Sequence, residues 1–206
     1  MSTLFTPRKR TDYIAVHCSA TQPKADIGVK EIRVWHRQQG WTDIGYHFVI
    51  RRSGNIEIGR PEHVIGAHVQ NFNANSVGIC MVGGINASGK AEDNFTPAQY
   101  AALAVLLREL KGRYPDAKIQ GHRDFPNVKK DCPSFDVRKW INETGVFNTS
   151  KVDDDPHARS VEITSATPTI YSLAKRYGYT VADILKVNPW VDPTKLKIGQ
   201  VIKLPG

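Results

Sequence analysis

Two continuous apolar runs most constrain the fold of this 206-residue chain. Residues 13–18 (Tyr-Ile-Ala-Val-His-Cys) and 77–82 (Val-Gly-Ile-Cys-Met-Val) are rich in strand-forming side chains, and each run ends in turn-forming residues. Short apolar runs of this kind predict buried strands. A sheet built from buried strands has to be covered by helices, so the segments around these runs decide the fold class.

The surrounding segments supply those helices and further strands. The predicted elements are a helix over 27–39 closed by Gly40, a hairpin over 45–59 with its turn at 53–55, a helix from the capping box at 96–99 to Gly112, a strand entered through Ile119, and a helix over 135–144. These assignments rest on apolar periodicity, on helix caps and on turn residues. The element order predicts an α/β domain with a mixed central sheet flanked by helices.

Charge and cysteine usage exclude several classes of protein. The net charge is +8, but the longest basic run is only residues 8–10, so we expect an anionic polymer as partner and no direct nucleic-acid binding. Three widely separated cysteines do not make a disulfide framework. The amino-terminal residues have charges but no apolar segment behind them, so they do not resemble a secretory signal. No apolar run has the length of a membrane span, so no membrane-spanning helix is expected.

Residues 118–134 combine the side chains that a borderline-soft metal prefers. His122 and Cys132 offer an imidazole nitrogen and a sulfur, and Lys130 lies two residues before the cysteine. A third ligand has to come from elsewhere in the chain. His17 lies at the end of a predicted strand, where α/β proteins often present functional side chains, but taken alone it is better explained as a core histidine.

Other polar residues have simpler local explanations. Tyr46 and His47 are neighbours at a strand start, so only one of them can face a given site and the other has to pack or pair elsewhere. Cys80 lies inside an apolar run and is expected to be a small core residue. The Asn- and Gly-rich loop over 66–78 is best explained by turn formation.

The last quarter of the chain differs in composition. Residues 148–160 are polar and acidic, contain a proline and lack periodicity, which predicts a linker. Residues 161–206 contain two short amphipathic helices and a terminal strand, which predicts a small βααβ domain. The predicted division is therefore a domain over 1–147, a linker over 148–160 and a second domain over 161–206.

Several motifs of the first domain resemble one enzyme family in sequence and in order. They are Val-His-Cys-Ser-Ala-Thr (16–21), Glu-Ile-Arg-Val-Trp-His (31–36), Gly-Trp-Thr-Asp-Ile-Gly-Tyr-His-Phe (40–48), and the segments 75–84, 94–99 and 132–136. Residues 12–140 resemble the type-2, zinc-dependent N-acetylmuramoyl-L-alanine amidases, which include lysozyme-amidases of T-odd phages and share their fold with peptidoglycan recognition proteins.

The resemblance implies a site and a reaction. It adds His17 to His122 and Cys132 as ligands of one Zn²⁺ per chain, which activates water and polarises a carbonyl. The implied reaction is hydrolysis of the amide between the lactyl group of N-acetylmuramic acid and L-alanine in peptidoglycan. Tyr46 matches the catalytic tyrosine, and Lys130, with Lys129 as the competing choice, is expected to stabilise the oxyanion.

Three further residues have expected roles near this site. His68 and Asn75 are expected to bind substrate in the groove. Asp124, beside His122, either orients a ligand or forms a surface salt bridge.

Residues 161–205 resemble a LysM module, a family that binds glycans containing N-acetylglucosamine. The matching segments are 170–177, 188–193 and 196–205. Thr167-Pro-Thr169 replaces the usual Gly-Asp-Thr in the loop that borders the glycan groove.

The resemblance to phage lysozyme-amidases implies a phage endolysin. Because the amino-terminal residues do not resemble a secretory signal, we expect that it is made in the host cytoplasm and reaches the cell wall after release through the membrane. Two alternatives remain. One is a non-catalytic peptidoglycan-binding protein, against which the complete set His17, Tyr46, His122, Lys130 and Cys132 argues. The other is a second role as an inhibitor of phage RNA polymerase, which the resemblance to T-odd phage lysozymes implies.

Overall fold

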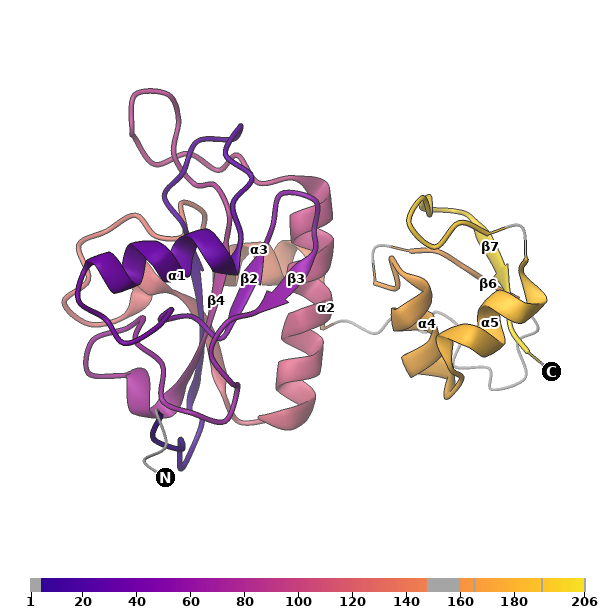
Figure 1. Ribbon diagram of the computed structural model, residues 1–206, viewed down its shortest axis with the longest axis horizontal. Helices are drawn as coiled ribbons and strands as arrows, with labels where there is room; N and C mark the ends of the chain where they lie inside the picture. The colour runs from indigo at the N-terminus through magenta and orange to yellow at the C-terminus, as the bar shows by residue number, and fades with distance from the viewer. Residues whose placement is uncertain (1–4, 148–159, 165, 190, 206) are drawn as a thin grey trace. The chain divides into compact units, whose positions relative to one another are not determined.

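The two apolar runs form strands β1 (Tyr13–Cys18) and β4 (Ser76–Met81), which pair in parallel. The computed structural model describes residues 5–147, 160–164, 166–189 and 191–205, and the chain divides into two units, 1–147 and 148–206 (Figure 1). In the first unit, β2 (Phe48–Ile50), β3 (Ile56–Ile58) and β5 (Lys118–Gly121) complete a five-stranded sheet of order β3-β2-β4-β1-β5. Only β3 runs antiparallel to its neighbour, so the sheet is mixed, as predicted.

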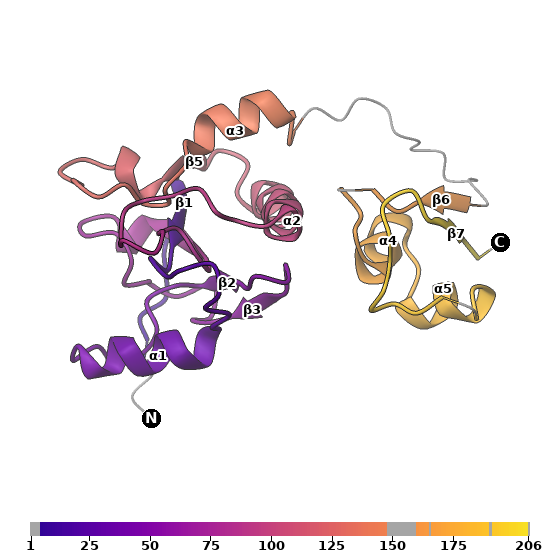
Figure 2. The same ribbon diagram turned by 90° about the horizontal axis from the view of Figure 1, so that it is seen from above.

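Helices cover both faces of this sheet. Helix α1 (Val29–Gln38) lies on one face, and α2 (Pro97–Arg113) and α3 (Val137–Thr144) lie on the other (Figure 2). Leu103, Leu106 and Leu107 of α2 pack on the larger core cluster, whereas Val29 and Ile32 of α1 pack on a separate one. The predicted α/β class is confirmed.

Strand periodicity assigns the side chains of β1 to these two faces. Ile14 and Val16 belong to the core under α2, so Ala15 and His17 point to the face that α1 covers. The register pairs Ala15 with Gly78 and His17 with Cys80. Cys80 is 0% exposed and packs with Val29 and Ile32, which confirms it as a core residue.

The predicted end of α2 at Gly112 is wrong by one residue. Gly112 stays inside the helix, which ends at Arg113, and it has no positive φ. A glycine ends a helix when it adopts the left-handed conformation, as Gly145 (φ 60°) does after α3. The predicted start of α1 at residue 27 is also early, because the helix begins at Val29.

The second unit is a βααβ arrangement, as predicted. Its elements are β6 (Ser160–Glu162), α4 (Ile170–Tyr177), α5 (Val181–Val187) and β7 (Val201–Lys203), with β6 and β7 antiparallel. Leu173, Ile184 and Ile202 form part of a single small core. The predicted linker lies outside the described residues except for Ser160, which begins β6.

In the described part of the chain, none of the helices combines the length and the apolar character that crossing a lipid bilayer requires.

Candidate metal centre

His17 occupies the carboxyl end of β1, and its side chain is 1% exposed. The neighbouring parallel strand β5 ends at Gly121, so the next residue, His122, lies at the same edge of the sheet. His122 opens the short 3-10 helix η2 (His122–Asp124). The centroids of the two imidazole rings are 4.5 Å apart. The parallel pairing of β1 and β5 thus brings together two histidines that lie far apart in the sequence.

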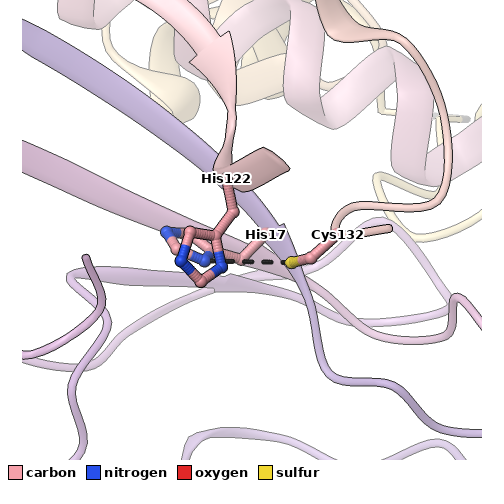
Figure 3. A group of neighbouring side chains, drawn as sticks. All are labelled: His17, His122 and Cys132. Atoms are coloured by element: carbon pink, nitrogen blue, oxygen red, sulfur yellow. Dashed lines mark hydrogen bonds between the residues drawn. The ribbon is translucent and has the colours of Figure 1, made fainter. Parts of the chain in front are cut away.

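Cys132 reaches this edge from the loop that follows η2. Its backbone oxygen accepts a hydrogen bond from Arg123 N (2.8 Å), and its sulfur accepts one from Cys18 N (3.3 Å). Cys132 Sγ lies 3.9 Å from His17 Nδ1 (Figure 3). One donor atom from each of His17, His122 and Cys132 lies within 4.8 Å of the others, so the three side chains converge on one point.

The electrostatics of these groups suit a cation. Burial lowers the pKa of His17 and of His122, which keeps both rings neutral, the form that binds metals. Competition with the nearby Cys18 sulfur for one proton, together with burial, raises the pKa of Cys132 well above the usual range of a thiol. A thiolate at Cys132 therefore needs a positive charge beside it. Imidazole and sulfur are both zinc donors, and three protein ligands are the number found in catalytic zinc sites such as Cys₂His or His₂Glu.

Tyr46 borders the centre. Its ring centroid is 5.2 Å from that of His17, and burial raises the pKa of its phenol well above the usual value, so the hydroxyl keeps its proton. The adjacent His47 is 0% exposed; its Nδ1 accepts a hydrogen bond from Gly78 N (2.9 Å) and its Nε2 lies 3.0 Å from Val64 O. The prediction that only one of these neighbours faces the site is confirmed.

The two lysines that compete for the oxyanion role are both exposed. Lys130 is the one whose charge, together with burial, lowers the pKa of His122. This electrostatic influence indicates that the Lys130 ammonium group lies near the candidate ligand His122.

The two residues predicted to bind substrate occupy different environments. His68 is 8% exposed, and its Nδ1 lies 3.1 Å from Nε2 of the candidate ligand His17. Asn75 lies next to Ser76, at the amino end of β4, where its side chain donates to Asp12 Oδ2 (2.7 Å). Because β1 and β4 are parallel, this is the end of the sheet opposite to His17. The structure does not bring Asn75 to the metal centre.

Asp124 has a structural role that the sequence left open. Its Oδ2 accepts a hydrogen bond from Gly121 N (2.8 Å), which fixes the turn that carries His122. The carboxylate thereby orients the backbone segment that carries His122.

Cys18 is the site residue that sequence analysis missed. Its backbone N–H contacts Cys132 Sγ, and its thiol lies 3.9 Å from the same atom. Its position next to His17 was a signal, but alternation in the strand implied that its side chain points away from the site. Only the tertiary position of the Cys132 loop reveals the contact.

Comparisons with known proteins agree with this geometry. The sequence model of the family described as N-acetylmuramoyl-L-alanine amidase matches residues 7–135, and that of the LysM domain matches residues 169–205. The endolysin of Enterobacteria phage K11 is 52% identical over 71% of this chain and 95% of its own length. The endolysin of Escherichia phage T7 is 49% identical over 71% of this chain and 96% of its own length.

A solved structure extends the similarity to three dimensions. The N-acetylmuramoyl-L-alanine amidase LysC from Clostridium intestinale superposes with a TM-score of 0.58 at 30% identity, covering 70% of this chain and 94% of that one. Residues 7–135 make up more than half of the sequence. The chain therefore belongs to the N-acetylmuramoyl-L-alanine amidase family, and it carries a LysM domain at its carboxyl end.

Proposed function

We propose that this protein is a zinc-dependent phage endolysin that hydrolyses the amide bond between N-acetylmuramic acid and the L-alanine of the stem peptide. Membership of the amidase family and the similarity to phage endolysins support the reaction and the role. The observation that carries the zinc proposal is the convergence of His17, His122 and Cys132 within 4.8 Å.

The donor set fits zinc better than a hard cation. Imidazole and thiolate are ligands for zinc, whereas magnesium and calcium prefer oxygen ligands. Three protein ligands are the number that catalytic zinc sites use, while structural sites use four. Bound zinc would supply Lewis acidity, which polarises the scissile carbonyl and lowers the pKa of the attacking water.

Tyr46 and Lys130 act on the charge that develops on the substrate. The Tyr46 phenol stays protonated, so it donates a hydrogen bond to the attacking water or to the oxyanion. The Lys130 ammonium stabilises the oxyanion, and a charged donor in such a site contributes roughly 3–4 kcal/mol. Both groups favour the transition state over the bound substrate, because the negative charge is absent before attack.

The two domains have complementary tasks in this proposal. Residues 1–147 form the catalytic domain, and residues 161–206 bind glycan strands and raise the effective concentration of the enzyme at the wall. The net charge of +8 favours encounters with anionic wall polymers. Synthesis takes place in the host cytoplasm, and the enzyme acts after release through the membrane. Binding to phage RNA polymerase stays a prediction of the sequence.

Mass spectrometry of fragments released from purified sacculi tests the proposed reaction. We expect free stem peptides with an L-alanine amino terminus and glycan strands that keep intact N-acetylmuramic acid, together with about one zinc per chain by elemental analysis. A protein that holds zinc but frees no such peptide is a binding protein, and the proposed reaction is then wrong. New reducing sugar ends in place of free peptides would indicate a glycosidase.

A further inference from the structure

His68 is buried against a metal ligand and has no task in the reaction described above. It follows β3 in a loop, where Asn73 Oδ1 accepts hydrogen bonds from the backbone nitrogens of His68 (2.7 Å) and Val69 (2.9 Å). Its ring meets that of His17 edge-on, at an interplanar angle of 86°. The 3.1 Å separation between His68 Nδ1 and His17 Nε2 is a hydrogen bond, so one of these two nitrogens donates.

The other contacts of His68 determine which nitrogen donates. Ser76 Oγ lies 2.7 Å from Phe72 O, and a carbonyl only accepts, so the Ser76 hydroxyl hydrogen is used there. The His68 Nε2 lies 3.5 Å from that same Ser76 oxygen, and it therefore has to be the donor in this long contact. A neutral imidazole with a hydrogen on Nε2 has a lone pair on Nδ1. His68 Nδ1 thus accepts, and His17 Nε2 donates.

The direction of this hydrogen bond fixes the tautomer of His17. With its hydrogen on Nε2, His17 carries its lone pair on Nδ1, the atom that lies 3.9 Å from Cys132 Sγ. We propose that His68 is a positioning residue that holds His17 in this tautomer and aims its Nδ1 lone pair at the metal centre. This inference rests on the proposed metal site and gives that site a specific supporting contact, of the kind that orients histidine ligands elsewhere.

Two glycines make room for the His68 ring. A Cβ built on Gly78 would lie 2.6 Å from His68 Cγ and Cδ2, and one built on Gly66 would lie 2.5 Å from Cδ2. Gly78 pairs with Ala15 of β1, two residues before His17, so the ring lies on the bare backbone of β4 beside the ligand. A glycine inside a strand is unfavourable unless another group approaches closely, and here that group is His68.

Both ring nitrogens of His68 already have protein partners. His17 contacts one and Ser76 the other, which leaves no nitrogen for a substrate. The inference therefore replaces the predicted substrate-binding role of His68.

Substitutions at His68 distinguish the effect of its hydrogen-bond acceptor, Nδ1, from the effect of its packing. His68→Phe keeps a flat ring but removes the acceptor, and we expect zinc affinity, measured by competition with a chromophoric chelator, to fall about 10- to 100-fold. His68→Asn returns an amide oxygen near the position of Nδ1, so it should recover most of the affinity. A purely structural role predicts the opposite order, because phenylalanine fills the site better than asparagine.

Gly78→Ala provides a test that leaves both histidines in the chain. The added methyl group displaces the His68 ring, so zinc affinity should fall while the nitrogens remain. Gly112→Ala is the matched control, because Gly112 lies in α2 with no atom within 4 Å of a built Cβ. Thermal unfolding of each variant in a chelator reports whether the fold is intact.

Long-range ¹H–¹⁵N NMR of histidine-labelled, metal-free protein reads the tautomer directly. We expect the hydrogen of His17 on Nε2 in the wild-type protein and a mixture of tautomers in His68→Phe. A hydrogen on His17 Nδ1 in the wild type, or equal zinc affinity in the wild type and His68→Phe, would overturn the inference. If the wild type itself binds no zinc, the proposed metal site fails instead, and the two failures are thereby distinguished.

Discussion

Two backbone contacts hold Cys132 in place. Its sulfur receives the Cys18 N–H, and its loop is tied to η2 through Arg123. A thiolate binds zinc, whereas a serine hydroxyl at neutral pH is a poor replacement. We expect Cys132→Ser to abolish zinc retention and lysis, as measured by elemental analysis and by clearing of sacculi.

Cys80→Ser is the matched control for that substitution. Cys80 is 0% exposed in β4, where it pairs with His17 and packs with α1, but its sulfur is not one of the three converging donor atoms, so the change should cost stability but leave lysis measurable. Equal loss of zinc in both variants would show that the assignment of Cys132 as a ligand is wrong.

Lys129 and Lys130 provide a second pair for comparison. Lys130→Met should lower kcat by about 100- to 1,000-fold with zinc content unchanged, because the oxyanion loses a charged donor. Lys129→Met should leave kcat close to that of the wild type. The lysine whose charge, besides burial, lowers the pKa of His122 is Lys130 and not Lys129. Steady-state kinetics on a soluble muramoyl peptide give both values. The reverse order would transfer the role to Lys129.

Buried histidines make the stability of the protein depend on pH. Burial lowers the pKa of His47 from 6.5 to about 4, so between these values the unfolded chain binds a proton that the folded protein does not. The free energy of unfolding of metal-free protein should therefore fall as pH drops below 6.5, by about 1.4 kcal/mol per pH unit for one proton. The lowered pKa values of His17 and His68 act in the same direction.

Urea unfolding in a chelator at about pH 7 and about pH 5 measures this slope. A flat profile for the wild type would mean that these rings are protonated in the folded protein.

At the scale of elements, Gln99 joins α2 to the sheet. Its side chain is 0% exposed; Nε2 donates to Ile50 O (3.1 Å) and Val82 O (2.8 Å), and Oε1 accepts from Thr96 N (3.1 Å). The sequence indicated only its part in the capping box. The bonds to β2 and to the residue after β4 became visible only in the folded chain, because they join segments that are distant in sequence.

Gln99→Met should therefore destabilise the first domain more than the loss of a helix cap alone. Two buried carbonyl groups each lose one donor, while Ile50 O keeps Val82 N (2.9 Å) and Val82 O keeps Arg52 Nη1 (3.2 Å), so we expect a loss of about 2 kcal/mol in the free energy of unfolding. Gln38→Met, at an exposed position of α1, should change it by less than about 0.5 kcal/mol. Urea unfolding of both variants makes the comparison, and similar stabilities would contradict the bridging role.

At the scale of the whole molecule, the two units have separate hydrophobic cores. Removal of residues 148–206 should leave turnover of soluble muramoyl peptides nearly intact. Binding to sacculi should weaken about 100-fold, because the tethered glycan-binding module no longer raises the effective concentration. Co-sedimentation with sacculi and kinetics on the soluble substrate measure the two effects, and unchanged sedimentation would remove the binding role of the LysM domain.

The sequence by itself determined the local structure of this protein and its family. Apolar runs, capping residues and turn residues act over a few positions, so β1, β4, the hairpin and the start of α2 could be predicted from them. The family motifs, not the spacing of the residues, linked His17 to His122 and Cys132.

Only the tertiary structure decided which polar side chains share a site. The parallel register that pairs Tyr13 with both Ser76 and Lys118 brings His17 and His122 to one edge of the sheet and leaves Asn75 at the other. The same register places Gly78 opposite Ala15, close to His17. Because Gly78 has no side chain, the His68 ring fits there. Register is a long-range property of packed strands, and for that reason no local pattern in the sequence reported it.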